Sequence, residues 1–188
     1  MQSVNYVKTE MKDITNKLTP VQLKFILHWG EMGLRWGINR TVAQIHALLY
    51  LAPEPLTAEQ ICTALGVARS NVSNSLRELQ NWGIVKVVHV MGDRRDHFES
   101  MKDVWEMFRV VLDERKKREI DPTVEVLRAC VEETGKTGGK ADHTHERFLA
   151  MRDFFETMSA WYEQVDQLST PSVIKFVKLG DKIRKLLG

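Results

Sequence analysis

This chain of 188 residues has few cysteines and no long apolar run. Its two cysteines, Cys62 and Cys130, lie far apart at positions expected to be helical, which favours two buried thiols over a disulfide. No apolar stretch approaches the roughly 20 residues needed to cross a bilayer. The N-terminal segment MQSVNYVKTEMKD also lacks the apolar core of a signal peptide. We therefore expect a cytoplasmic protein.

The sequence also lacks the motifs of common catalytic and nucleotide-binding folds. It contains no phosphate-binding loop of the Walker type, no dinucleotide-binding glycine fingerprint and no G-x-S-x-G nucleophile turn. The segment GKTGGK at 135–140 contains Gly-Lys-Thr, but the upstream glycine and strand of a phosphate loop are missing. This segment and the residues up to 143 are expected to form a surface loop. We expect neither an enzyme nor a bound cofactor.

A strong excess of basic charge is missing as well. The formal net charge is only +2, with 43% hydrophobic and 28% charged residues, as in an ordinary globular protein. Within residues 57–100 the basic and acidic side chains are equal in number: Arg69, Arg77, Lys86, Arg94 and Arg95 against Glu59, Glu78, Asp93, Asp96 and Glu99. Any binding to nucleic acid must depend on where the charges lie and not on a bulk basic field.

Residues 57–100 carry the most informative pattern of the chain. Thr57 and Gln60 form the signature of a capping box at a helix start, and Gly66 is placed to end that helix. A second helix follows, with apolar residues at helical spacing and Gly83 at its end. IVKVVHV then reads as a strand, GDRRD as a turn and HFES as the returning strand. This order predicts a winged helix-turn-helix with a two-stranded β wing.

The second helix of this motif has an unusual outer face. With Val72, Leu76 and Leu79 buried, about 100° per residue leaves short polar and basic residues on the other side. Asn and Ser are mediocre helix formers but can approach base edges, and Arg can grip guanine or a phosphate. A merely solvated polar face is the alternative, but the helix-turn before it and the hairpin after it favour DNA. The expected DNA-binding residues are Arg69, Ser70, Asn71, Ser73, Asn74 and Arg77, with Arg94 and Arg95 in the wing.

These residues carry a family resemblance. The run VSNSLRELQNWGIV and the wing GDRR resemble the MarR superfamily of winged-helix transcriptional regulators. The upstream segment WGINRTVAQIHALLYL and the downstream RKKREIDPT are similar to its GbsR-like branch. The resemblance implies a homodimeric repressor that binds double-stranded DNA. Because some members of that branch sense choline or glycine betaine, it also implies a small-molecule effector.

Aromatic residues outside the motif are candidates for an effector site. Quaternary ammonium ions bind between aromatic rings because ring faces carry negative potential. Aromatic residues at helical spacing also occur as ordinary core, and this alternative stays open. The candidate lining residues are Trp29, Trp36, Trp105 and Trp161. On the first predicted helix, Gly30 and Gly33 indicate either close packing by another helix or room for a ligand.

The helix predicted near residues 145–168 has a wide apolar face. Six apolar residues follow one another in steps of three and four, as in a heptad seam. We expect this seam to be buried against the N-terminal helices and a second copy of the chain; packing within one chain is the alternative. The predicted dimerisation residues are Phe148, Met151, Phe155, Met158, Tyr162 and Val165. Upstream of this helix, Asp121-Pro122 predicts a kink or a helix restart.

A metal-sensing repressor is a competing hypothesis. His143 and His145 lie two apart beside Asp142 and Glu146, and Cys130 could join them, but the spacing matches no known helical ligand pair. A protein-interaction module without DNA binding is a further alternative. The preferred prediction is a mainly α protein with additional N- and C-terminal dimerisation helices. It has a DNA-binding domain over residues 1–100 and a helical dimerisation region over 101–188, and it acts as an effector-controlled transcriptional repressor.

Overall fold

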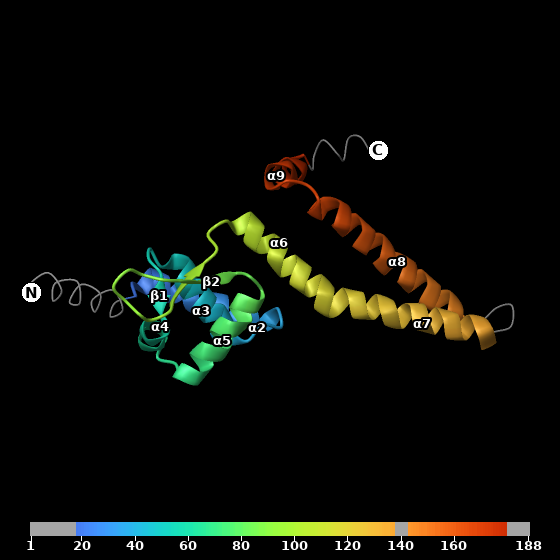
Figure 1. The fold of residues 1–188 in the computed structure, drawn as a ribbon. Coiled ribbons are helices and arrows are strands. Elements are labelled where there is room, and N and C mark those ends of the chain that lie inside the picture. The colour runs from blue at the N-terminus through green and yellow to red at the C-terminus, as the bar shows by residue number, and fades with distance from the viewer. Residues whose placement is uncertain (1–17, 138–142, 180–188) are drawn as a thin grey trace, which may run out of the picture. The chain divides into compact units, whose positions relative to one another are not determined.

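The computed structural model describes residues 18–137 and 143–179 and is mainly helical, as predicted (Figure 1). Contacts divide the chain into two compact units, with the boundary between Met107 and Phe108. The sequence had placed a boundary at residue 100, whereas the observed one falls within the helix α6 (Val104–Arg115). The middle of the expected surface loop, 138–142, lies outside the described residues.

Two packed helices open the first unit. α2 (Pro20–Arg35) starts at Thr19, whose side chain forms a capping box with Gln22, and α3 (Arg40–Leu51) starts at Asn39. At Gly33 an added Cβ would lie 2.5 Å from the Cβ of Ala43, and at Gly30 it would lie 2.8 Å from Cγ of Gln44. The two glycines therefore allow α2 and α3 to approach closely, which decides between the two readings of these positions in favour of helix packing.

The helix-turn-helix follows as predicted. α4 (Ala58–Leu65) begins with the capping box of Thr57 and Gln60, and Gly66 ends it with a left-handed φ of 64°. That conformation is inexpensive for glycine alone. α5 (Arg69–Asn81) then buries one face against the unit's core, through Val72, Ser75, Leu76 and Leu79.

The wing belongs to a three-stranded antiparallel sheet, not a two-stranded one. β2 (Val85–Val88) and β3 (His97–Ser100) pair as predicted, but β1 (Leu56–Thr57) pairs with the other side of β3. A two-residue strand is too short to show alternation in the sequence, so β1 was missed. Because α4 starts where β1 ends, the sheet ties the wing to the start of the helix-turn-helix.

A single apolar core holds these elements together. It is drawn from α2, α3, α4, α5 and the sheet, and its most deeply buried side chains are Ile26, Ile45, Leu49, Ile61, Val72 and Leu79. Lys102, just after β3, closes the end of α3. Its Nζ donates to the carbonyls of Leu49, Tyr50 and Ala52 at 2.9, 2.9 and 3.0 Å. These carbonyls would otherwise lack partners at the helix end.

The second unit contains most of α6, a π-helical turn at Lys116–Ile120 (η1), α7 (Asp121–Thr137), α8 (His143–Asp166) and α9 (Thr170–Lys178). The predicted break before Pro122 is realised as this π turn, through which the helix continues. α7 and α8 lie side by side (Figure 1). Lys116 links them, with its Nζ 2.8 Å from Asp121 and 3.4 Å from Glu163. None of the helices described is long and apolar enough to span a membrane.

Candidate nucleic-acid interface

The outer face of α5 presents the side chains expected there. All six predicted residues of this helix are exposed: Arg69, Ser70, Asn71, Ser73, Asn74 and Arg77. The predicted buried stripe lies on the opposite face. Nη1 of Arg77 lies 3.4 Å from Oδ1 of Asn74, a long hydrogen bond that holds the two side chains next to each other. The helix therefore offers adjacent amide and guanidinium groups to anything that approaches it.

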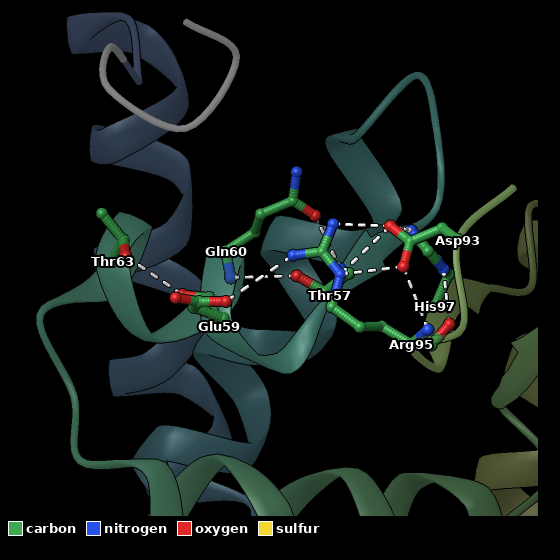
Figure 2. A network of polar contacts seen from close by, with 7 residues as sticks. All are labelled: Thr57, Glu59, Gln60, Thr63, Asp93, Arg95 and His97. Carbon is green, nitrogen blue, oxygen red and sulfur yellow. Dashed lines mark hydrogen bonds and ion pairs between the residues drawn. The ribbon is translucent and has the colours of Figure 1, made fainter. Parts of the chain in front are cut away.

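The wing turn contains a tight charged pair that the sequence analysis did not single out (Figure 2). Asp93 accepts from the backbone N–H of Arg95 at 3.0 Å and from its Nε at 2.9 Å, and Nη2 donates to Oδ2 at 2.5 Å. These hydrogen bonds hold the pKa of the Asp93 carboxyl well below its usual range, and Asp93 raises the pKa of Arg95. In the sequence, this pair is indicated by an Asp and an Arg two residues apart in a predicted turn. Counting the charges of residues 57–100 does not reveal it.

The two wing arginines, Arg94 and Arg95, differ in their ion pairs. Arg95 also lies 3.6 Å, Nη1 to Oε2, from Glu59 in the first turn of α4, so two carboxylates flank its guanidinium (Figure 2). Arg94 is exposed and has no ion pair with any described residue. The same holds for Arg69 and Arg77 on α5, whereas Lys86 on β2 pairs with Glu99 at 3.2 Å. Although basic and acidic residues are equal in number over residues 57–100, three arginines on α5 and the wing have no ion pair with a described residue.

A hollow of about 480 Å³ lies between α4, α5 and the wing. Its lining consists of Thr57, Ala58, Glu59, Arg69, Ser73, Leu76, Arg77, Gln80, Arg94, Arg95, Asp96 and Phe98. Four arginines border it, against Glu59 and Asp96. It brings together five of the eight predicted DNA-binding residues, while Ser70, Asn71 and Asn74 lie elsewhere on α5. Gln80, which the sequence analysis missed, lies one helical turn beyond Arg77.

Two of the four candidate effector residues are in contact. The rings of Trp29 and Trp36 meet edge to face at 5.8 Å, and Nε1 of Trp29 donates to Nδ1 of His46 at 3.3 Å. Burial, aided by the charge of Lys102, lowers the pKa of His46 to about 4, so its ring is neutral near pH 7. Trp105 is half-buried in the first turn of α6, and Trp161 lies on α8 in the second unit.

The predicted seam of α8 divides between two faces. Phe148, Phe155, Tyr162 and Val165 are half-buried, whereas Met151 and Met158 are 54% and 44% exposed. Met151 and Met158 are therefore not buried within one chain, and burial of all six residues in a dimer stays a prediction. The two exposed members form a row with three other exposed apolar residues: Met151, Phe154, Met158, Trp161 and Leu168. The first four lie on α8 and Leu168 follows two residues after its end; together the five are called the α8 outer row below.

The histidines considered for a metal site make other contacts. Nδ1 of His145 lies 2.8 Å from the hydroxyl of Thr134, and His143 is exposed. No group of three or more His, Cys, Asp and Glu side chains suited to a metal ion occurs among residues 18–137 and 143–179. Asp142 lies outside these ranges.

The fold and the polar face of α5 define a winged helix-turn-helix protein. Residues 36–96 match the family model described as MarR family. The chain is 23% identical over 154 residues to the HTH-type transcriptional repressor GbsR of Bacillus subtilis (strain 168), covering 78% of this chain and 85% of that protein. The resemblance to the MarR family and its GbsR-like members is therefore confirmed.

Two further relatives from Bacillus subtilis (strain 168) match shorter parts of the chain. The putative HTH-type transcriptional regulator YvaV is 25% identical over 97 residues, which are 52% of this chain and 55% of that protein. The HTH-type transcriptional repressor OpcR is 25% identical over 73 residues, which are 39% of this chain and 40% of that protein. The whole of the second unit, which begins at Phe108, lies beyond the family match at residues 36–96.

A crystal structure described as that of a transcriptional regulator has the same fold. It superimposes with a TM-score of 0.62 and 21% sequence identity, covering 78% of this chain and 96% of that one. At this identity the likeness supports the fold alone. The predicted fold class, mainly α with a winged helix-turn-helix, is confirmed.

Proposed function

We propose that this chain is a sequence-specific, DNA-binding transcriptional repressor that acts as a homodimer. The observation that carries the proposal is the outer face of α5, where Arg69, Ser70, Asn71, Asn74 and Arg77 are all exposed on the second helix of the motif. In this architecture the second helix enters the major groove. Its relatives GbsR and OpcR, which are named as repressors, support the direction of control.

Different parts of the surface would perform different tasks. Asn74 can pair with adenine and Arg77 with guanine, since these are the bases whose edges match an amide and a guanidinium. The hollow between α5 and the wing, bordered by four arginines, suits the phosphate backbone between the two grooves. Arg94 and Arg95 on the wing would then reach phosphates or a narrow minor groove, where negative potential is enhanced.

The proposed dimer uses α8. The α8 outer row is an apolar stripe on a helix whose other face packs on α7. An antiparallel copy of α8 could place Met158 opposite Trp161 of the partner helix and Trp161 opposite its Met158, so the stripe can pack against itself. Two-fold symmetry would bring two copies of α5 to successive major-groove turns, about 34 Å apart, on an inverted-repeat operator.

We further propose control by a small effector such as choline or glycine betaine. The observation behind this is the contact between Trp29 and Trp36, with Trp36 45% exposed, beside a histidine that stays neutral. Aromatic faces of this kind attract quaternary ammonium groups. Effector-binding roles for Trp105 and Trp161 stay predictions from the sequence. An effector that favours one spacing of the two α5 helices would change operator affinity by about 1–3 kcal/mol.

Selection of bound sequences from a random DNA library tests the proposal. The wild-type chain should enrich one sequence with two-fold symmetry, and the combined Ser70, Asn71, Asn74 and Arg77 alanine variant should enrich none. All four side chains are exposed, so the variant should keep its fold, which thermal unfolding would verify. Equal specific affinity of the variant and the wild type would refute the assignment of α5. Failure of the wild type to enrich any sequence would favour a protein-interaction module.

A further inference from the structure

His97 is a buried polar residue at the root of the wing. It is the first residue of β3, the middle strand, and it pairs with Thr57 of β1 on one side and Val88 of β2 on the other. Only 2% of the residue is exposed. Because two neighbouring strands hold its backbone, the ring is fixed by the sheet and not by the wing turn.

The ring contacts the backbone of Arg95 and lies close to Asp93. Nδ1 of His97 is 3.0 Å from the backbone carbonyl oxygen of Arg95. A carbonyl only accepts hydrogen bonds, so Nδ1 carries the hydrogen in this contact. Nε2 is 3.6 Å from Oδ2 of Asp93, the carboxylate that grips Arg95, and has no hydrogen-bond partner among the described residues (Figure 2).

A buried histidine at this position makes an unfavourable contribution to the stability of the fold. Burying an imidazole with one nitrogen unpaired is unfavourable, whereas a phenylalanine of similar shape would carry no polar atom. What a phenylalanine could not do is donate a hydrogen bond to the Arg95 carbonyl. The cost therefore points to a role in holding the turn Asp93–Arg95.

We propose that His97 is a positioning residue for Arg95: its hydrogen bond to the Arg95 carbonyl fixes the backbone from which the guanidinium, held by Asp93, projects, so that the wing meets the minor groove in one orientation. This rests on the proposed function, because it requires that the wing contacts DNA. A purely structural histidine would support the fold alone. Its loss would weaken binding to every DNA sequence alike and would add to the loss of Arg95.

The test compares two duplexes carrying the selected operator, with either A·T or G·C pairs where the wing lies. The wild type should prefer the A·T duplex roughly tenfold, because a narrow A·T minor groove attracts arginine. Arg95→Ala and His97→Phe should each abolish most of that preference, and the double variant should lose no more than either single one. His97→Asn, whose amide can still donate to the carbonyl, should retain part of it. His145→Phe is the matched control: a half-buried histidine on α8 whose Nδ1 contacts the hydroxyl of Thr134, and its loss should leave the preference intact.

An additive loss in the double variant, or a preference unchanged by His97→Phe, overturns the proposal while leaving DNA binding in place. Absence of any specific binding by the wild type overturns the proposed function instead. If His97→Phe does not fold, nitrogen-15 NMR of the wild type decides the geometry. A hydrogen on Nδ1 supports the bond to Arg95, and a neutral ring protonated at Nε2 contradicts it. Asp93→Asn, at a partly exposed site, should reproduce the lost preference.

Discussion

At the residue scale, the roles in the surface depend on which charges are already paired. Arg95 lies between two carboxylates, while Arg69, Arg77 and Arg94 have no ion pair with described residues. Arg69 and Arg94 can pair with phosphates or guanine without first losing an ion pair, and Arg77 would give up only its long hydrogen bond to Asn74. Moving Arg95 away from Glu59 requires only the loss of an exposed contact, which typically contributes about 0–1 kcal/mol.

Arg77→Ala should weaken binding to the specific operator by about 1–3 kcal/mol and relax the choice of base at one position in each half-site. The reason is that no other described side chain on α5 duplicates its guanidinium toward that end of the helix. Titration of labelled operator DNA measures the change. Arg128→Ala, on α7, is the matched control and should leave operator affinity unchanged. Equal effects of the two substitutions would contradict a base-reading role for Arg77.

His46 should make stability depend on pH. Burial lowers its pKa to about 4 in the folded chain, against 6.5 when unfolded, so the unfolded state binds the proton more readily. Stability is therefore unaffected above pH 6.5 and falls as the pH drops from 6.5 toward 4, by up to about 3 kcal/mol from this group.

Urea unfolding at several pH values measures this slope. Other groups contribute in the wild type, so the informative quantity is the difference between the wild type and His46→Phe, whose slope over this interval should be shallower by about one proton. Parallel slopes for the two proteins would show that His46 does not resist protonation.

At the element scale, short local patterns were predictable and contacts between distant segments were not. The capping box of Thr57 and Gln60 and the left-handed Gly66 follow from neighbouring residues, and the structure has both. β1 was missed because its partner strand lies some forty residues later. The contacts of His97 with Asp93 and Arg95 were missed because they depend on how the turn folds back. The π turn before Pro122 was not predicted, because the sequence does not show that the helix continues past a proline, which has no backbone N–H to donate.

The contact between α2 and α3 gives a direct test of packing. Gly33→Ala would place a Cβ 2.5 Å from the Cβ of Ala43. The gain in helix propensity is about 1 kcal/mol, but forced separation of the helices should outweigh it and leave the chain about 1–2 kcal/mol less stable. Adding Ala43→Gly removes the opposing atom and should recover part of the loss. Chemical unfolding of the two variants measures both effects, and a stabilised single variant would refute the close approach.

At the scale of the whole molecule, the sequence predicted the helix-turn-helix half of the chain better than the half that contains α8. The helix-turn-helix and wing were readable because the pattern of caps, glycines and apolar residues is specific to that motif. On α8 a wide apolar face left the inward direction undetermined, since two adjacent rows satisfy heptad spacing equally well. The structure separates them: Phe155 and Tyr162 are half-buried, while Phe154 and Trp161 are 60% and 49% exposed.

Charged substitutions on the α8 outer row should dissociate the proposed dimer. Phe154→Glu with Trp161→Glu is expected to give a folded monomer, because both side chains are exposed and their loss costs little within one chain. Val126→Glu, at an exposed apolar position on α7, should leave the dimer intact. Sedimentation velocity at micromolar concentration distinguishes these states. A wild-type monomer would rule out the homodimer.

Base reading by α5 in the major groove can be tested by guanine N7 methylation interference on the selected operator. The wild type should show interfering guanines in two symmetric clusters about one helical turn, 10–10.5 base pairs, apart. Arg77→Ala should lose interference at one guanine in each cluster and keep it at the others. Interference that is the same in both proteins, or spread evenly along the duplex, would contradict the account.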